Sequence, residues 1–261
     1  MGRNAILRSL LASTLVFVAR PALAWGSLLL IEPPPASGAL AIGPSVWTLP
    51  KYPGARGTTA TVLPGVDGYA ASGLFASTDT GLGWNLSRRA DLQYGARLWP
   101  QLGRSQADTP PGLSRIGTRL QLEAFANYAP LPALLLQAGV LRGAGRHHDG
   151  TQVEIGATSG LPLGQDLLAI GLATTFANRA YRQGYLGVSA AESAASGLPA
   201  WSIGAGWHDV SLTFSAEHRL TEAWRVSGQW VTARLLGPAR GSPLTASARQ
   251  SAATLTLWRQ L

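Results

Sequence analysis

The sequence predicts an all-β protein: a transmembrane, antiparallel, up-and-down β-barrel of about 12 strands, with 10 strands as the alternative. Three observations predict this fold. Hydrophobic residues make up 46% of the 261 residues, whereas charged residues make up only 13%, about half the usual share of about 25%. No apolar run reaches the roughly 18–20 residues that a membrane-spanning helix needs. Apolar residues recur instead at every second position, which is the period of a β-strand.

The N-terminal segment has the pattern of a secretory signal peptide. A basic start and an apolar stretch at 10–18 lead to a small-residue Ala-Leu-Ala site at 22–24, as such peptides require. We therefore expect residues 1–24 to be a cleaved signal and residues 25–261 to be the barrel domain. The alternative is an anchor helix, which Arg20 disfavours because it interrupts the apolar run.

Composition excludes several classes of function. The chain has no cysteine, which rules out disulfide scaffolds, iron–sulfur clusters, cysteine–zinc sites and thiol enzymes. The formal net charge is +8, but the basic residues are scattered and form no run of five or six, so nucleic acid is not an expected partner. We expect no cofactor.

The segment 166–178 shows the alternation most clearly. Leu168, Ile170 and Leu172 fall on one face, while Ala169 and Gly171 fall on the other, because successive strand residues face opposite sides. Similar patterns occur along most of the chain, separated by clusters of turn residues. The candidate strands, some of which must merge, are 39–49, 58–71, 72–78, 81–88, 91–101, 116–129, 133–142, 151–161, 166–178, 200–209, 211–219, 224–235 and 248–261.

The composition of the second face favours a membrane barrel over a secreted sandwich. A water-facing sheet surface should carry many charges, whereas this face is mostly Gly, Ala, Ser and Thr, which suits a lumen. Cleavage after residue 24 leaves 261 − 24 = 237 residues, and about 20 residues per strand and connection give about 12 strands. Small inward residues indicate a narrow, largely filled interior.

Aromatic residues give partial support for a membrane wall. Trp201 and Trp207 are six residues apart, as are Trp224 and Trp230, so each pair is expected to share a strand face. Six residues cover too little of the apolar band for one pair to mark both interfaces.

Charged residues within the predicted strands should lie inside the barrel or at its ends, because an arginine facing the middle of the lipid costs about 2–4 kcal/mol. An internal network that fills the lumen is the expected arrangement, and a conducting pore lining is the alternative. The residues concerned are Glu123, Glu154, Asp166, Glu217, Arg225 and Arg234.

Metal chemistry has one weak candidate. His147, His148 and Asp149 are ligand types that suit zinc or nickel, but they lie in a glycine-rich segment that reads as a solvated loop. We therefore expect no metal site.

Catalytic chemistry is also not expected. His208 and Asp209 are neighbours in a predicted strand, so their side chains should face opposite sides and form no dyad. A serine nucleophile would have to come from Ser189, Ser193 or Ser196, and the chain has no G-x-S-x-G elbow.

A family resemblance enters at residues 185–201. An aromatic-Gly-Val segment leads into a small-residue loop with Ser-Gly-Leu and then an aromatic, and the glycine-rich stretch at 204–210 follows with its Asp-Val pair. Leu-Thr-x-x-Trp at 220–224 and Gly-Leu-Gly-Trp-Asn-Leu at 81–86 are further matches. This pattern resembles the MipA/OmpV family of outer-membrane proteins. The residues that carry the resemblance, or that would serve an interaction, are Tyr185, Gly187, Val188, Ser193, Ser196, Gly197, Trp201 and Asp209.

The resemblance implies a non-catalytic barrel in the bacterial outer membrane, in contact with its lipid. It implies a scaffold that links the murein lytic transglycosylase MltA to a bifunctional penicillin-binding protein. The small-residue loop 190–199 is our candidate interaction element, and the alternative is that this loop packs into the lumen of its own barrel. The alternatives are a small porin or channel and a barrel enzyme that acts on lipid.

The chain departs from the family pattern at its end. Barrels of this kind normally finish on Phe, whereas this one ends on Leu261, and Arg259 interrupts the alternate apolar residues of the last strand.

Overall fold

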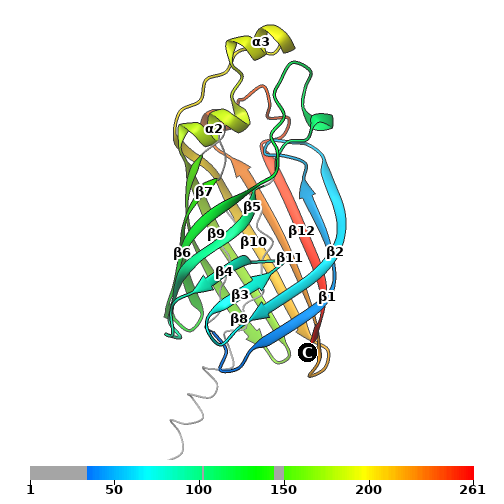
Figure 1. Ribbon diagram of the computed structural model, residues 1–261, viewed down its shortest axis with the longest axis vertical. Coiled ribbons are helices and arrows are strands. Elements are labelled where there is room, and N and C mark those ends of the chain that lie inside the picture. The colour runs from blue at the N-terminus through cyan, green and yellow to red at the C-terminus, as the bar shows by residue number, and fades with distance from the viewer. Residues whose placement is uncertain (1–33, 102, 144–149) are drawn as a thin grey trace, which may run out of the picture.

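The computed structural model describes residues 34–101, 103–143 and 150–261. Within them, twelve strands close into one antiparallel barrel, in which β12 pairs with β1 (Figure 1). The predicted fold and strand number are therefore confirmed. The strands are β1 (Ala39–Pro50), β2 (Thr58–Tyr69), β3 (Leu74–Ser77), β4 (Gly81–Asn85), β5 (Leu92–Gln101), β6 (Arg119–Leu131), β7 (Leu134–Gly143), β8 (Thr151–Leu163), β9 (Asp166–Ala177), β10 (Gly206–Arg219), β11 (Trp224–Leu235) and β12 (Arg249–Gln260).

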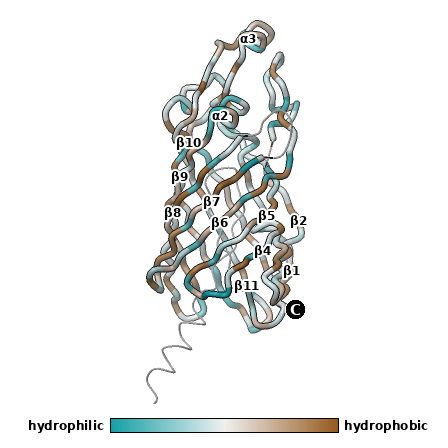
Figure 2. The backbone as a smooth tube through the Cα atoms, turned by 60° about the vertical axis from the view of Figure 1, so that its left-hand side comes forward, coloured by the Kyte–Doolittle hydropathy of each residue, from teal (hydrophilic) through white to brown (hydrophobic). Residues whose placement is uncertain are grey.

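The alternation seen in the sequence sets the two faces of the wall. On β9, Leu168, Ile170 and Leu172 point outward and are 44–58% exposed, whereas the inward Ala173 and Thr175 are buried. Figure 2 shows hydrophobic residues interspersed with more polar ones along the strands of the wall. A closed barrel satisfies its backbone hydrogen bonds internally, so a wall with this apolar exterior is built to lie in a membrane.

The two ends of the barrel differ. The connections at one end are the short segments 70–73, 86–91, 132–133, 164–165 and 220–223, and the C-terminus lies there too. The connections at the other end include the long segments 102–118, 178–205 and 236–248. Barrels of the outer-membrane type have short periplasmic turns and longer extracellular loops, so we assign the short-turn end to the periplasm.

Two helices occupy the longest loop, where the sequence predicted only a turn cluster and a strand. Helix α2 (Arg179–Leu186) is capped by the side chain of Asn178, and α3 (Ala190–Ser196) begins with a capping box between Ser189 and Glu192. Among the described residues, no helix is long and apolar enough to cross a membrane. The predicted strands 200–209 and 211–219 are one strand, β10, which starts at Gly206. Trp201 therefore lies in the loop and does not share a strand face with Trp207, so that expected pair is wrong.

Helix α2 closes the long-loop end of the lumen. Its buried face, which includes Tyr181, Tyr185 and Leu186, packs on inward residues of β11 such as Val231 and Leu235 in the main hydrophobic cluster. Aromatic burial of this size is strongly stabilising. The apolar core of this protein is thus a plug inside the barrel mouth.

The wall is incomplete beside β2. Strands β3 and β4 have only 4 and 5 residues, fewer than the 9–11 that a spanning strand needs. Their turn meets β2 where the Thr78 amide donates to the Val66 carbonyl at 2.8 Å. From Thr58 to Gly65, the second edge of β2 has no strand partner in the described part of the chain.

Candidate functional site

The lumen below the plug holds a buried ion pair. Arg97 on β5 and Glu123 on β6 are opposite each other in the register. The Nε and Nη2 atoms of Arg97 donate to Glu123 Oε2 at 2.8 and 2.6 Å, and the two side chains are 2% and 3% exposed. Arg97 also donates to the Thr80 carbonyl at 3.4 Å, which ties the β3–β4 turn to the pair. Charged and aromatic side chains therefore fill the interior together with the small residues that the sequence led us to expect there.

A second buried pair corrects a sequence expectation. His208 and Asp209 were predicted to face opposite sides, but a β-bulge between Trp207 and Asp209 turns both inward, because the extra residue of a bulge changes the alternation. His208 Nε2 lies 3.9 Å from Asp209 Oδ2, which is too far for a hydrogen bond. The Tyr181 ring meets the His208 ring edge-on at 5.3 Å. The pair is sealed beneath α2.

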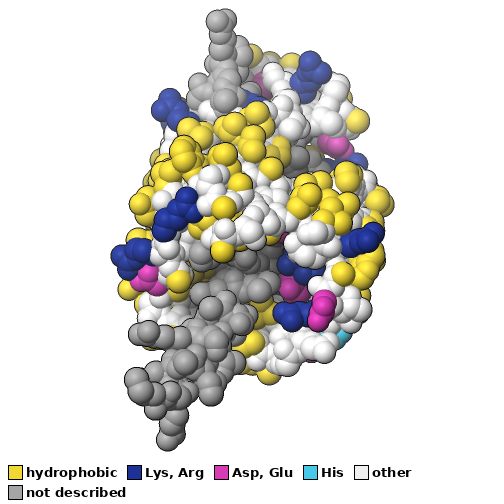
Figure 3. All heavy atoms as spheres, turned by 60° about the horizontal axis from the view of Figure 1, so that its bottom comes forward, with side chains coloured by type: hydrophobic (Ala, Val, Ile, Leu, Met, Phe, Trp, Pro, Cys, Tyr) yellow, Lys and Arg dark blue, Asp and Glu magenta, His cyan; other side chains and the backbone are white. Residues whose placement is uncertain are grey.

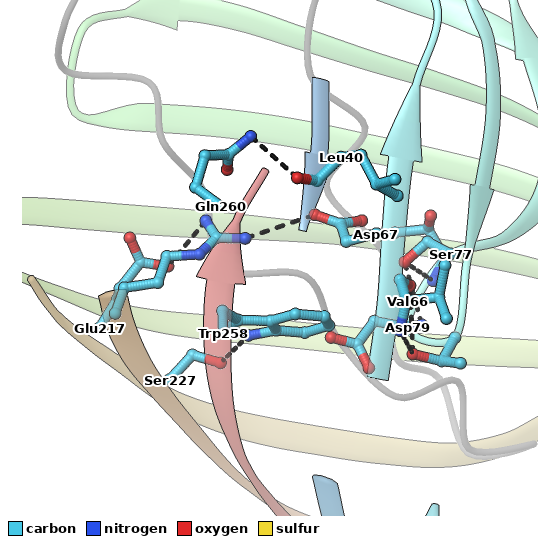
Figure 4. A network of polar contacts seen from close by, with 12 residues as sticks. Leu40, Val66, Asp67, Ser77, Asp79, Glu217, Ser227, Trp258 and Gln260 are labelled. Atoms are coloured by element: carbon cyan, nitrogen blue, oxygen red, sulfur yellow. Dashed lines mark hydrogen bonds and ion pairs between the residues drawn. The ribbon is translucent and has the colours of Figure 1, made fainter. Parts of the chain in front are cut away.

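The short-turn end of the lumen carries a charged cluster, shown in Figure 4. Arg225 on β11 lies between Glu217 on β10 and Asp67 on β2, with nitrogen–oxygen distances of 3.4 and 3.5 Å. The Arg225 guanidinium stacks over the ring of Trp258 at 5.5 Å, and Trp258 donates to Ser227 Oγ at 2.9 Å. These contacts connect β2, β10, β11 and β12 at the mouth of the barrel.

A third carboxylate adjoins this cluster. Asp79, in the β3–β4 turn, is 3% exposed, and its amide donates to Ser77 Oγ at 3.1 Å. Among the described residues, Asp79 Oδ1 and Asp67 Oδ1 have no hydrogen-bond partner. A pocket of about 100 Å³ borders Asp67, Glu217 and Arg225. The mouth therefore holds fixed charges around a small space, and braces the strand ends.

Most of the charged residues chosen from the sequence lie where they were expected. Glu123, Glu154 and Glu217 are inside the barrel, as is Arg225. Asp166 is at the short-turn rim, where its carboxylate meets His218 Nδ1 at 2.7 Å. Arg234 is exposed near the long-loop end of β11.

The structure brings several family-like residues together around α2 and α3. Val188 and Trp201 exchange backbone hydrogen bonds of 2.9 and 2.8 Å, and Tyr185 lies in the adjoining cluster with Trp201. Burial raises the pKa of Tyr185 to about 12. A Cβ on Gly187 would lie 2.5 Å from the backbone carbonyl oxygen of Gln183, so a larger residue there would displace the end of α2.

The remaining residues of that set have separate places. Ser193 Oγ and Ser196 Oγ donate to the carbonyls of Leu198 and Glu192, and Gly197 ends α3 in the left-handed region at φ 74°. Asp209 is inside the lumen, as described. The set builds a folded cap and plug. The hydroxyl of Ser189 also serves α3, through Glu192, so these serines are engaged locally.

No group of three or more His, Cys, Asp or Glu residues that could hold a metal occurs in the part of the chain that the structure describes. The candidate residues His147, His148 and Asp149 lie outside it.

The comparisons with known proteins identify the family. A model described as "MltA-interacting protein MipA" matches residues 42–259. The chain belongs to this family. The family match runs from within β1 to within β12 and includes α2 and the bulge in β10. It confirms the resemblance drawn from residues 185–201. A search of curated proteins found no sequence that matches the chain significantly.

Three solved membrane proteins align with most of this chain. An outer-membrane channel from Pseudomonas putida F1 is 12% identical, with a TM-score of 0.41 over 88% of this chain and 97% of the channel. A loop-deletion mutant of OmpT of Vibrio cholerae is 8% identical, with a TM-score of 0.36 over 86% of this chain and 100% of that one. The Pseudomonas putida toluene transporter TodX is 13% identical, with a TM-score of 0.31 over 92% of this chain and 74% of the transporter. At TM-scores this low, they indicate nothing about what this chain binds or transports.

Proposed function

We propose that this MipA-family barrel is a non-catalytic scaffold of the bacterial outer membrane. Its short-turn end would hold a murein lytic transglycosylase and, beside it, a peptidoglycan synthase. The observation that carries the proposal is the match to a family named for interaction with MltA over residues 42–259.

The filled lumen favours a function in docking other proteins over a function in transport. A conduit needs an open path, whereas here α2 and its cluster occupy one end and the buried ion pair of Arg97 and Glu123 takes up part of the interior. The charged mouth fixes the ends of β2, β10, β11 and β12 relative to one another. A rigid end is what a docking scaffold needs, because binding then orders few groups.

The murein lies in the periplasm, so the proposed contact is at the short-turn end. Figure 3 shows basic and acidic side chains around this end. Exposed groups there include Arg89, which is paired with Asp91 at 2.6 Å, and Glu222 in the β10–β11 turn. The segment 190–199 lies at the opposite end. We propose that this segment does not contact the periplasmic enzymes.

Affinity capture tests this proposal. Tagged protein from solubilised envelope should retain a lytic transglycosylase, and the combined changes Arg89→Glu and Glu222→Arg should weaken retention about fivefold to tenfold. The matched control is Arg240→Glu, an exposed charge at the long-loop end, which should retain the enzyme fully. The scaffold proposal would be contradicted if the tagged protein retained no murein enzyme, or if the charge-reversal variant and the Arg240→Glu control had equal effects.

Two further measurements separate the alternatives. Stable open steps in a planar bilayer would favour a channel. Turnover of lipid by the purified barrel would favour an enzyme.

A further inference from the structure

Among the residues that the structure describes, none forms a strand along the second edge of β2 from Thr58 to Gly65, so polar backbone groups there face the gap in the wall. Val66 exchanges hydrogen bonds with Thr78, so the amides and carbonyls at every second position above it, up to Thr58, point to the same open edge. Pro64 is one of these positions and has no N–H, but Val62 and Ala60 do. Unpaired backbone groups are strongly disfavoured in hydrocarbon. The edge therefore requires a polar occupant.

The gap between the unpaired edge of β2 and β5, here called the opening, lies at the membrane depth of the apolar outer surface. Val62 on the open edge is 74% exposed, and Leu98, on β5 beyond the β3–β4 turn, is 41% exposed. The inward residues Thr59 and Thr61 are exposed as well, although inward residues on the complete wall of β10, such as Thr213, are buried. The lumen side of β2 is thus reachable here.

Behind this edge lies a pocket of about 470 Å³. Thr59 and Thr61 form one side, the end of β1 forms another, and segments 103–106 and 115–118 of the long loop form the rest. The pocket lies toward the long-loop end, where the outer leaflet has its headgroups. It differs from the short-turn mouth, which is rich in carboxylates.

The charge in this pocket is positive. Lys51, Arg104 and Arg115 line it, and no lining residue among those described is acidic. Asp108 offsets Lys51, with Nζ and Oδ1 at 2.8 Å. Arg104 is 3% exposed, donates to the carbonyls of Tyr185 and Ser114 and lies over the Tyr52 ring. Its Nε has no hydrogen-bond partner in the described part of the chain.

From this arrangement we propose that the opening beside β2 is a lateral binding site for an anionic amphiphile of the outer leaflet. Its phosphate would lie in the pocket with Lys51, Arg104 and Arg115, because phosphate pairs strongly with such groups. The oxygens of its polar linkage would accept hydrogen bonds from the amides of Ala60 and Val62 on the open edge of β2, and its acyl chain would leave the barrel between Val62 and Leu98. This site is independent of the proposed docking at the short-turn end.

A lipid-retention experiment tests whether the basic pocket recognises an anionic headgroup. Full-length protein in nonionic detergent is titrated with phosphatidic acid, phosphatidylcholine or inorganic phosphate, and bound lipid is counted by native mass spectrometry. We expect one phosphatidic acid per barrel, with a preference of about tenfold over phosphatidylcholine. The double variant Lys51→Gln with Arg115→Gln should lose that preference. The control Arg89→Gln, at the short-turn end, should keep it.

A single introduced cysteine tests the position of the opening, since the natural chain has none. Thr61→Cys should react with a maleimide carried on a lipid, and phosphatidic acid should slow this reaction. Thr213→Cys, at an inward position of the complete wall, should stay unreactive.

Any of three binding or labelling results would overturn the proposal, as would the phosphate result that follows: equal retention of the two lipids, an unchanged lipid preference in the double variant, or equal labelling of the two cysteine variants. Displacement of lipid by inorganic phosphate at an equal concentration would show that the acyl chain contributes nothing, and would also overturn it.

Discussion

The buried pair between Arg97 and Glu123 makes a quantitative prediction about stability. Replacing Glu123 with Leu leaves the Arg97 guanidinium buried without the oxygen that accepts its two bonds of 2.8 and 2.6 Å. Loss of one partner of a buried ion pair costs about 3–5 kcal/mol, so the unfolding equilibrium should shift by a factor of about 10² to 10³ or more. The pair Arg97→Met with Glu123→Leu should restore most of this stability, because paired apolar residues are often neutral or stabilising.

The measurement is a double-mutant cycle on the folded barrel in detergent. Unfolding by guanidinium chloride is followed by tryptophan fluorescence. The folded fraction is checked by the heat-dependent shift in gel mobility. Trp99 lies near the guanidinium, with the Arg97 Cζ 5.9 Å from its ring, so its emission should report the loss directly. A single-variant cost below about 1 kcal/mol, or a double variant no better than Glu123→Leu, would refute the reasoning, since an exposed pair behaves in that way.

Three further changes have expected outcomes. Gly43→Ala should block closure between β1 and β12, because its Cβ would lie 1.7 Å from the Leu257 carbonyl oxygen; gel mobility should show mostly unfolded chain. Burial raises the pKa of Tyr185 to about 12. The neutral phenol therefore stabilises the fold fully below the ordinary phenol pKa of about 10, and this stabilisation is lost as the pH rises from there through the raised pKa. In a titration of phenolate absorbance, Tyr185→Phe should lack one tyrosine that ionises at high pH. The hydrogen bond from Lys51 lowers the pKa of Asp108, so the contact persists above the ordinary carboxyl pKa of about 3.9 and is lost as pH falls through the lowered value; an NMR titration should show the midpoint rise in Lys51→Gln.

The sequence predicted what depends on simple alternation. The outward leucines of β9 and the inward carboxylates of Glu123 and Glu217 follow from a two-residue period, and the chain length led to twelve strands. The bulge beside His208 was not predictable, because one extra residue in a strand has no sequence signature of its own. It overturns the expectation that the side chains of His208 and Asp209 face opposite sides.

The helices could have been found in part. Ser189 followed three residues later by Glu192 is a capping-box pattern, and Gly197 is a typical residue to end a helix. The shortness of β3 and β4 could not be seen, because Leu82 and Trp84 alternate as in a full strand. Only the structure shows that the turn between β3 and β4 lies beside Val66, so that the two short strands cover only the lower part of β2.

The closure of the barrel has a kinetic consequence. β1 and β12 must meet although Ser45 and Thr256, whose hydroxyl oxygens are 2.6 Å apart, are separated by 211 positions, whereas every other strand pairs with its neighbour in sequence. The loop-closure entropy of this contact is the largest in the molecule, and contacts of high sequence separation slow folding. The hairpins should form first and the join between β1 and β12 last. A circular permutant opened at residues 164–165 would convert that join into a local hairpin and transfer the slow step to β8 and β9.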